Sequence, residues 1–191
     1  MNVKKNILIV SCMLMLFTCK KQETLPPQTA QGNNNFGCYV NGFLFTPIRT
    51  TVGTTFGDEA ALSLTYSKLI EVGSEAVPVG SEKYIFRVEG RRQDNGVKKS
   101  VGVSALNING LKAGDSFLIN NRVKGNFMAS YKEEKGSSLN IFTAYEGTIT
   151  ILKVTDSFVA GIFWFTAEDS QGNKVNVSEG RFDVTYLRKN N

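Results

Sequence analysis

Histidine is missing from the sequence, and cysteine and tryptophan are scarce, with three and one among 191 residues. Without histidine the chain cannot form a Ser–His–Asp or Cys–His catalytic site, a His-ligated zinc site or a haem site with a proximal histidine. Three cysteines are too few for a disulfide scaffold or a zinc site of four thiolates. The Gly-x-Ser-x-Gly, Ser-x-x-Lys, Gly-x-Gly-x-x-Gly and P-loop patterns are absent too. We therefore expect no catalytic residues, no metal and no cofactor.

The sequence also lacks an apolar run long enough to cross a membrane as a helix. Its longest apolar stretch, Ile7 to Phe17, would form a helix of about 17 Å, whereas the hydrocarbon core is about 30 Å thick. Lys4 and Lys5 precede this stretch, as basic residues precede the apolar part of a secretory signal. Residues 1–18 are therefore predicted to be a signal peptide.

The end of this segment predicts lipidation. Leu16-Phe17-Thr18-Cys19 resembles the lipobox of bacterial lipoproteins, in which the cysteine receives a diacylglyceryl group, with acyl chains such as palmitate, and the chain is cut before it. Cleavage is expected between Thr18 and Cys19, with Cys19 as the lipidated residue. Ile9-Val10-Ser11-Cys12 is the alternative, but it leaves only about four apolar residues before it, where about 7–15 are usual.

A polar segment follows the predicted lipidation site. Residues 19–35 contain Pro26-Pro27, Gly32 and three successive asparagines, but no aromatic residue and one large aliphatic residue, Leu25. Such a composition cannot bury a core and is typical of a flexible tether. We predict a tether over 19–35 and a single folded domain over 36–191.

From Phe36 onward the hydrophobic pattern has a period of two, which is typical of half-buried antiparallel strands. Turn sequences such as Asn41-Gly42 and Asp94-Asn95-Gly96 separate the alternating stretches. The clearest alternations place these residues on buried faces: Leu62, Leu64 and Tyr66; Tyr84, Phe86 and Val88; Val101, Val103 and Ala105; Phe127, Ala129 and Tyr131; Val175 and Val177; Phe182, Val184 and Tyr186. We predict an all-β fold, an antiparallel β-sandwich or flattened barrel of about nine or ten strands.

One stretch, Val159 to Ala167, is apolar on both faces of a strand, with Trp164 on one face and Phe163 and Phe165 on the other. Such a strand is usually central and covered on both sides, although one face could instead line a ligand cavity. If the domain binds a ligand, we expect Trp164, Tyr145 and Tyr131 to face it.

Other candidate sites have simpler structural explanations. Cys38 lacks a histidine to activate it and is expected to be a small buried residue. Glu133-Glu134 is expected near a solvated hairpin tip, and the loop Glu168 to Asn173 as a plain turn rather than a calcium site. The basic residues around Asp94 to Gly96 are expected on a solvated sheet face, with no role in nucleic-acid binding: Arg87, Arg91, Arg92, Lys98 and Lys99.

Two segments resemble an uncharacterised lipoprotein family of Bacteroidota. They are Leu25-Pro26-Pro27 leading into Phe36-Gly37-Cys38-Tyr39-Val40-Asn41-Gly42, and Gly161-Ile162-Phe163-Trp164-Phe165 with Gly180-Arg181-Phe182-Asp183-Val184. The resemblance implies an exported β domain anchored in the envelope, with no known activity. In that phylum acidic residues after the lipidated cysteine tend to mark surface export, and Lys20-Lys21-Gln22-Glu23 lacks such a cluster. The resemblance therefore favours the periplasmic face of the outer membrane, with surface display as the alternative.

Together these features predict a non-catalytic, membrane-anchored envelope protein that binds another envelope protein or a carbohydrate. The alternative is an accessory subunit of an outer-membrane complex that has no small ligand, and a hydrolase is the third possibility.

Overall fold

The computed structural model describes residues 23–47, 61–69 and 83–186, and these contain ten β-strands. The strands are β1 (Asn35–Val40), β2 (Phe43–Phe45), β3 (Leu62–Lys68), β4 (Tyr84–Asp94), β5 (Val97–Ile108), β6 (Ser116–Leu118), β7 (Met128–Lys135), β8 (Ser138–Val154), β9 (Phe158–Glu168) and β10 (Lys174–Thr185). The predicted all-β class and strand number are confirmed. No helix in this part of the chain is long and apolar enough to cross a membrane.

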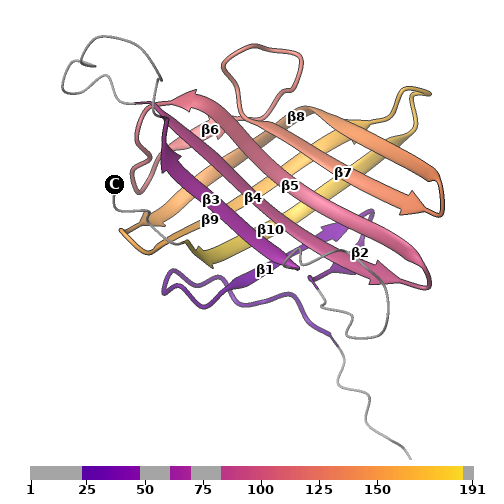
Figure 1. The fold of residues 1–191 in the computed structure, drawn as a ribbon, viewed down its shortest axis with the longest axis horizontal. Coiled ribbons are helices and arrows are strands. Elements are labelled where there is room, and N and C mark those ends of the chain that lie inside the picture. The colour runs from indigo at the N-terminus through magenta and orange to yellow at the C-terminus, as the bar shows by residue number, and fades with distance from the viewer. Residues whose placement is uncertain (1–22, 48–60, 70–82, 187–191) are drawn as a thin grey trace, which may run out of the picture.

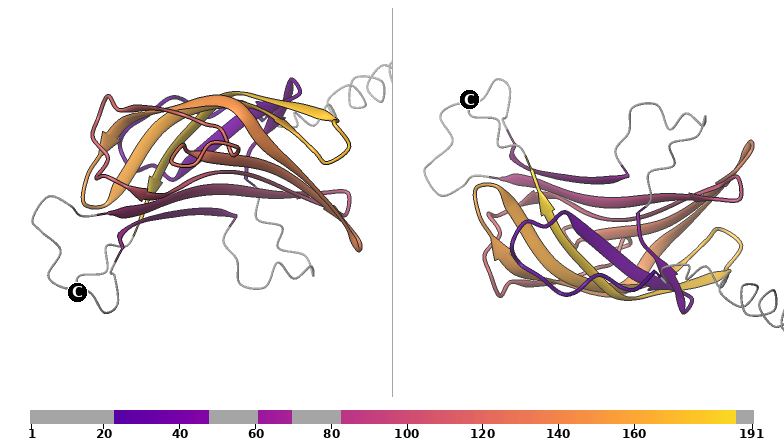
Figure 2. Two further views of the ribbon diagram at one scale, coloured as in Figure 1. Left: turned by 90° about the horizontal axis from the view of Figure 1, so that it is seen from above. Right: turned by 90° about the horizontal axis from the view of Figure 1, so that it is seen from below.

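All ten strands belong to one antiparallel sheet of order β2-β1-β10-β9-β8-β7-β5-β4-β3, with β6 paired to β8. The sheet does not close, because β2 and β3 stand at its two ends. It curls instead, so that β3, β4 and β5 lie across from β8, β9, β10 and β1 (Figures 1 and 2). This open, curled sheet agrees with the predicted sandwich or flattened barrel, and we refer to it as the barrel.

Phenylalanines connect the two layers through the core, which also contains many valines and alanines. Phe86 on β4 contacts Phe182 on β10, with ring centroids 5.9 Å apart, and Phe182 lies near Phe163 on β9. Phe36 reaches from β1 to Phe163 at 5.6 Å. These rings join the two layers and bury a large apolar area, which is the main source of stability for such a domain. The buried residues alternate along the strands as the sequence predicts.

The last strand contains a β-bulge that the sequence pattern does not reveal. Val177 pairs with Phe165 and Gly180 pairs with Phe163, so an extra residue lies between the two pairs. Glu179 adopts a positive φ of 50° there. Because the bulge shifts the alternation by one residue, Val175 and Val177 lie on the same inner face as Phe182. Two alternating stretches therefore form one continuous strand.

Four tight connections lie toward the same end of the barrel, which we call the hairpin end (Figure 2). They are the turns β1–β2, β4–β5, β7–β8 and β9–β10. The pairing of Val97 with Lys135 places the β4–β5 turn beside the β7–β8 turn. The Asn41 amide donates to the Asn176 carbonyl, which places the β1–β2 turn beside the start of β10. The predicted Asn41-Gly42 and Asn95-Gly96 turns both have positive φ at both residues, as a two-residue hairpin turn requires.

The N-terminal segment Glu23 to Asn34, which we call the strap, forms no regular structure. Its stretch from Pro26 to Gly32 packs on the outer face of the sheet, whereas Glu23 reaches Arg92 at the hairpin end. Gly37 on β1 lies so close beneath it that an added Cβ would be 2.5 Å from Pro26. Gly32 packs against Phe158 and Thr185 in the same way. The sequence predicts a flexible tether over 19–35, whereas the structure places residues 23–34 against the domain.

Candidate functional site

The three aromatic residues predicted to face a ligand lie in different places. Trp164 lies on the outer face of β9 and is 41% exposed. Tyr145 lies at a β-bulge of β8, where two cations stand over its ring: the Arg122 guanidinium at 5.5 Å and the Lys174 ammonium at 5.6 Å from the centroid. Tyr131 is buried on the inner face of β7. The structure therefore does not bring them together, and Trp164 is the most exposed of the three.

Trp164 is part of a row of side chains that crosses five strands on the outer face. Its direct cross-strand neighbour on β8 is Thr148, which in turn pairs with the exposed Leu118 of β6. On the other side the row continues over the β10 bulge to Ser178, which pairs with Tyr39 of β1. Residues that pair directly across antiparallel strands share a face and contact one another. This Trp164 row is the first candidate binding surface.

Hydroxyl groups surround the exposed indole. Thr150 and Thr166 lie on the same outer face of β8 and β9 and are half-buried. The Ser116 and Thr150 hydroxyls are 3.1 Å apart, which continues this polar ladder onto β6. The surface therefore combines a flat apolar ring with donors and acceptors that can rotate to suit a ligand.

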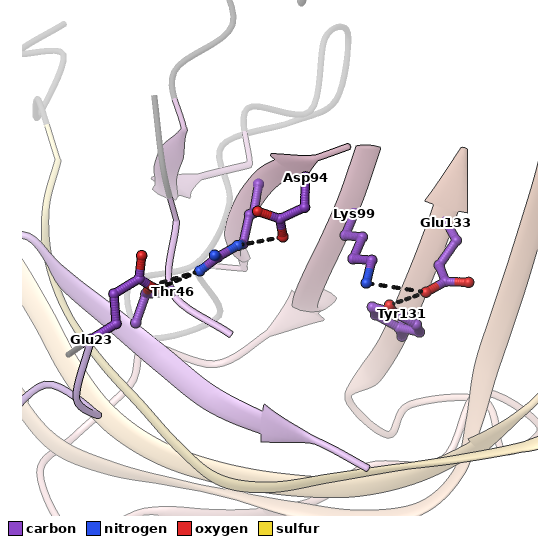
Figure 3. A network of polar contacts seen from close by, with 7 residues as sticks. Glu23, Thr46, Asp94, Lys99, Tyr131 and Glu133 are labelled. Carbon is purple, nitrogen blue, oxygen red and sulfur yellow. Dashed lines mark hydrogen bonds and ion pairs between the residues drawn. The ribbon is translucent and has the colours of Figure 1, made fainter. Parts of the chain in front are cut away.

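A second group of side chains, which we call the polar cluster, lies on the inner face near the hairpin end (Figure 3). It consists of Glu23, Thr46, Arg92, Asp94, Lys99, Tyr131 and Glu133. Its centre is Arg92 of β4, whose guanidinium binds the Asp94 carboxylate at 2.5 Å and the Glu23 carboxylate at 2.7 Å. Arg92 also donates to the Thr46 hydroxyl at 3.3 Å. Three separate parts of the chain thus meet at one guanidinium.

The other half of the polar cluster joins β5 and β7. The Tyr131 hydroxyl donates to the Glu133 carboxylate at 2.5 Å, and the Lys99 ammonium lies 3.8 Å from the same carboxylate. Burial raises the pKa of Tyr131, and the hydrogen bond to Glu133 raises it further, so the phenol stays protonated. Among the residues that the structure describes, no buried side-chain nitrogen or oxygen lacks a hydrogen-bond partner. The cluster is therefore a satisfied network that ties strands together.

The basic stretch of β4 and β5 is divided between the two faces of the sheet. Arg92 and Lys99 point inward, whereas Arg87 and Arg91 lie on the outer face and both donate to Glu89 at 2.8 Å. Burial by itself would raise the pKa of Glu89, but the charges of Arg91 and Arg87 outweigh it and hold that pKa below its usual value. Glu89 thus neutralises part of the basic face.

Asp183 on β10 is the residue that holds the strap. Its carboxylate is buried and accepts hydrogen bonds from the Thr29 hydroxyl at 2.7 Å, the Gln31 amide at 3.0 Å and the Gly32 amide at 2.7 Å. Burial would raise the pKa of Asp183, yet these donors together with the Asn33 amide lower it. No local sequence pattern indicates this contact, because the partners are about 150 residues apart.

The remaining candidates take the structural roles expected of them. Asp169 organises the β9–β10 loop by accepting from the Asn173 side chain at 2.8 Å and from the Gln171 and Asn173 amides at 2.9 Å, and these bonds lower its pKa. Cys38 is fully buried, and burial raises the pKa of its thiol. Glu133 and Glu134 lie just before the β7–β8 turn.

Within the described ranges, no three acidic or cysteine side chains gather closely enough to hold a metal ion. Cys12, Thr18 and Cys19 lie outside those ranges. No family model, curated protein or solved structure matches the chain. Among the described residues the exposed Trp164 row and the polar cluster are the two groupings of side chains that stand out, and the Cys38 thiol is buried.

Proposed function

We propose that this chain is a non-catalytic lipoprotein of the cell envelope, anchored through Cys19 to the outer membrane on its periplasmic face. The lipobox-like sequence at Leu16 to Cys19 supports the anchor, together with the short apolar stretch before it. The resemblance to a lipoprotein family of Bacteroidota supports the same placement. Two or more acyl chains hold a protein on a membrane durably, whereas one gives only marginal binding.

We further propose that the domain binds a ligand through the Trp164 row, and that the ligand is an envelope carbohydrate. The observation that carries this proposal is the indole of Trp164, 41% exposed and flanked by threonine hydroxyls. Sugar rings present flat C–H faces and many hydroxyls, so they fit an aromatic ring with rotatable donors and acceptors beside it. The Trp164 row lies on the outer face of the sheet, and the strap does not cover Trp164.

A second candidate function, an accessory subunit of an outer-membrane complex, is supported by the free edge of the sheet. β3 pairs with β4 and, among the described strands, has no partner on its other side. A strand at the end of a sheet can accept a strand from another protein. In that case the partner would recognise β3, and the Trp164 row would be dispensable.

Two measurements test these proposals. Mass spectrometry of the mature protein should show an acylated N-terminal Cys19, and an unmodified or differently placed N-terminus would contradict the anchor. Binding to envelope polysaccharide, measured by calorimetry, should fall at least about tenfold in Trp164→Ala, because an aromatic contact of about 1.4 kcal/mol or more is lost.

The matched control for this substitution is Leu139→Ala. Leu139 is also an exposed apolar side chain of the outer face, at 57%, and lies on β8 about 30 Å along the strand from Thr148. It should leave affinity unchanged. Equal affinities in both variants would contradict the carbohydrate surface. Crosslinking from β3 to an outer-membrane protein would then favour the accessory subunit.

A further inference from the structure

The strap fixes the point at which the chain leaves the domain toward the predicted anchor. Glu23, the first described residue, is bound by the Arg92 guanidinium at 2.7 Å and by the Thr46 hydroxyl at 3.2 Å. Cys19 lies four residues before Glu23. Four residues span at most about 14 Å when fully extended. An anchor on Cys19 therefore cannot lie far from the Arg92 side of the barrel.

This exit point lies at the hairpin end. Arg92 is two residues from Asp94, the last residue of β4 before its turn, and Thr46 directly follows β2. Phe43, the first residue of β2 after the Asn41-Gly42 turn, is only three residues from Thr46, or about 10 Å along the chain. The lipid anchor on Cys19 and the β1–β2 turn therefore lie near the same end of the barrel.

Large apolar side chains are exposed at this end. Phe43 is 79% exposed, the highest value among the large hydrophobic residues described, and Leu139 beside the β7–β8 turn is 57% exposed. Phenylalanine and leucine on an anchored surface bind the interface between headgroups and acyl chains. Lys20 and Lys21, between Cys19 and Glu23, add charge that suits anionic headgroups.

We propose that the hairpin end faces the bilayer that holds Cys19, and that Phe43 inserts into its interfacial layer. This inference rests on the proposed lipid anchor. Asp183 holds the strap on the sheet, and the salt bridge between Glu23 and Arg92 brings the first residue of the strap to the hairpin end. The opposite end of the barrel, where β5 ends at Ile108, then points away from the membrane.

The test uses the acylated mature protein, beginning at Cys19, in vesicles of phosphatidylethanolamine with a minority of phosphatidylglycerol. Trp164→Phe removes the single native tryptophan, so that F43W in this background reports on one site. Insertion into the interface should shift the emission of this tryptophan to the blue, and a lipid that carries a nitroxide near its headgroup should quench it. The matched control is L106W, since Leu106 is also exposed, at 54%, and lies about 30 Å from the β4–β5 turn along β5.

Quenching of F43W but not of L106W supports the proposal. Equal quenching of the two, or none, in protein whose Cys19 is shown to be acylated would overturn the orientation and leave the anchor intact. Protein without acyl groups on Cys19 would overturn both. Glu23→Ala should reduce the difference between F43W and L106W, because it releases the first residues of the strap from Arg92, and an unchanged difference would overturn the role of the Glu23–Arg92 pair.

Discussion

Replacement of Asp183 should release the strap from the sheet, because its carboxylate is the acceptor for several strap donors. The Thr29 hydroxyl and the Gln31 amide both bind Oδ2, whereas the Gly32 amide binds Oδ1. In Asp183→Asn the amide oxygen can replace Oδ2, but the new NH₂ group then faces the Gly32 N–H. One buried donor is left without an acceptor, which costs about 1–3 kcal/mol. Asp183→Ala removes every acceptor, leaves several donors unpaired and should cost about 3 kcal/mol.

Two assays measure this loss. Urea denaturation should show a lower free energy of unfolding in both variants, with Asp183→Ala the lower. Amide hydrogen exchange should show faster exchange at Gln31 and Gly32 than in the wild type. Glu146→Gln is the control, since Glu146 is an exposed carboxylate on β8 and its replacement should change stability by less than about 0.5 kcal/mol.

The effect of Asp183 should also depend on pH. The folded pKa lies below the unfolded value of about 3.9, so the stabilisation is complete above that value and is lost as the pH falls through the folded pKa. The difference between wild type and Asp183→Asn should therefore be full at pH 7 and shrink below about pH 4. Wild-type stability and wild-type exchange at Gln31 and Gly32 in Asp183→Asn at pH 7 would refute this account of the strap.

Two further predictions concern the outer face of β4 and the buried thiol. Glu89→Gln should lower the free energy of unfolding by about 1–2 kcal/mol at neutral pH, because two arginines lose their charged partner. This penalty should shrink below about pH 4, where Glu89 becomes protonated. An unchanged urea midpoint at neutral pH would contradict the prediction. With Cys12 and Cys19 replaced by serine, Cys38 should react with a thiol reagent only after unfolding. Burial raises the pKa of its thiol and blocks access of the reagent. Rapid labelling of the native protein would show that the Cys38 thiol is accessible to solvent.

The alternation of apolar residues predicts most of the strands, but it cannot locate bulges. A bulge shifts the phase by one residue, and the backbone torsions that create it leave no apolar signal. Tyr145 is an example: it lies between Ala144 and Glu146, where the register with β9 shifts, so alternation does not assign it a face. Tyr131 is the opposite case, because its alternation with Phe127 and Ala129 already predicts burial. The prediction that Tyr131 faces a ligand therefore conflicts with the alternation of its own strand, which predicts that Tyr131 is buried.

The strap shows a second limit of sequence reasoning. Composition describes residues 19–35 correctly as unable to form a core, since they carry little apolar area. Such a segment can still be ordered when another part of the chain supplies a strong polar acceptor at the right place. Asp183 does this from β10, and in the sequence it looks like an ordinary polar residue on the solvent side of a strand. Contacts of this kind depend on register across the whole sheet.

The two ends of the strap have different consequences for an anchored protein. The Asp183 end is buried and hydrogen-bonded on all sides, so it holds the strap on the sheet. The Glu23 end is an ion pair whose carboxylate side chain is 47% exposed, and exposed pairs contribute only about 0–1 kcal/mol. The length of free chain between domain and membrane is therefore set by the weaker contact. If that pair opens, the Arg181 guanidinium, which donates to the Pro26 carbonyl at 3.0 Å, and Asp183 beyond it still hold the strap, so the domain can tilt at the membrane without leaving it.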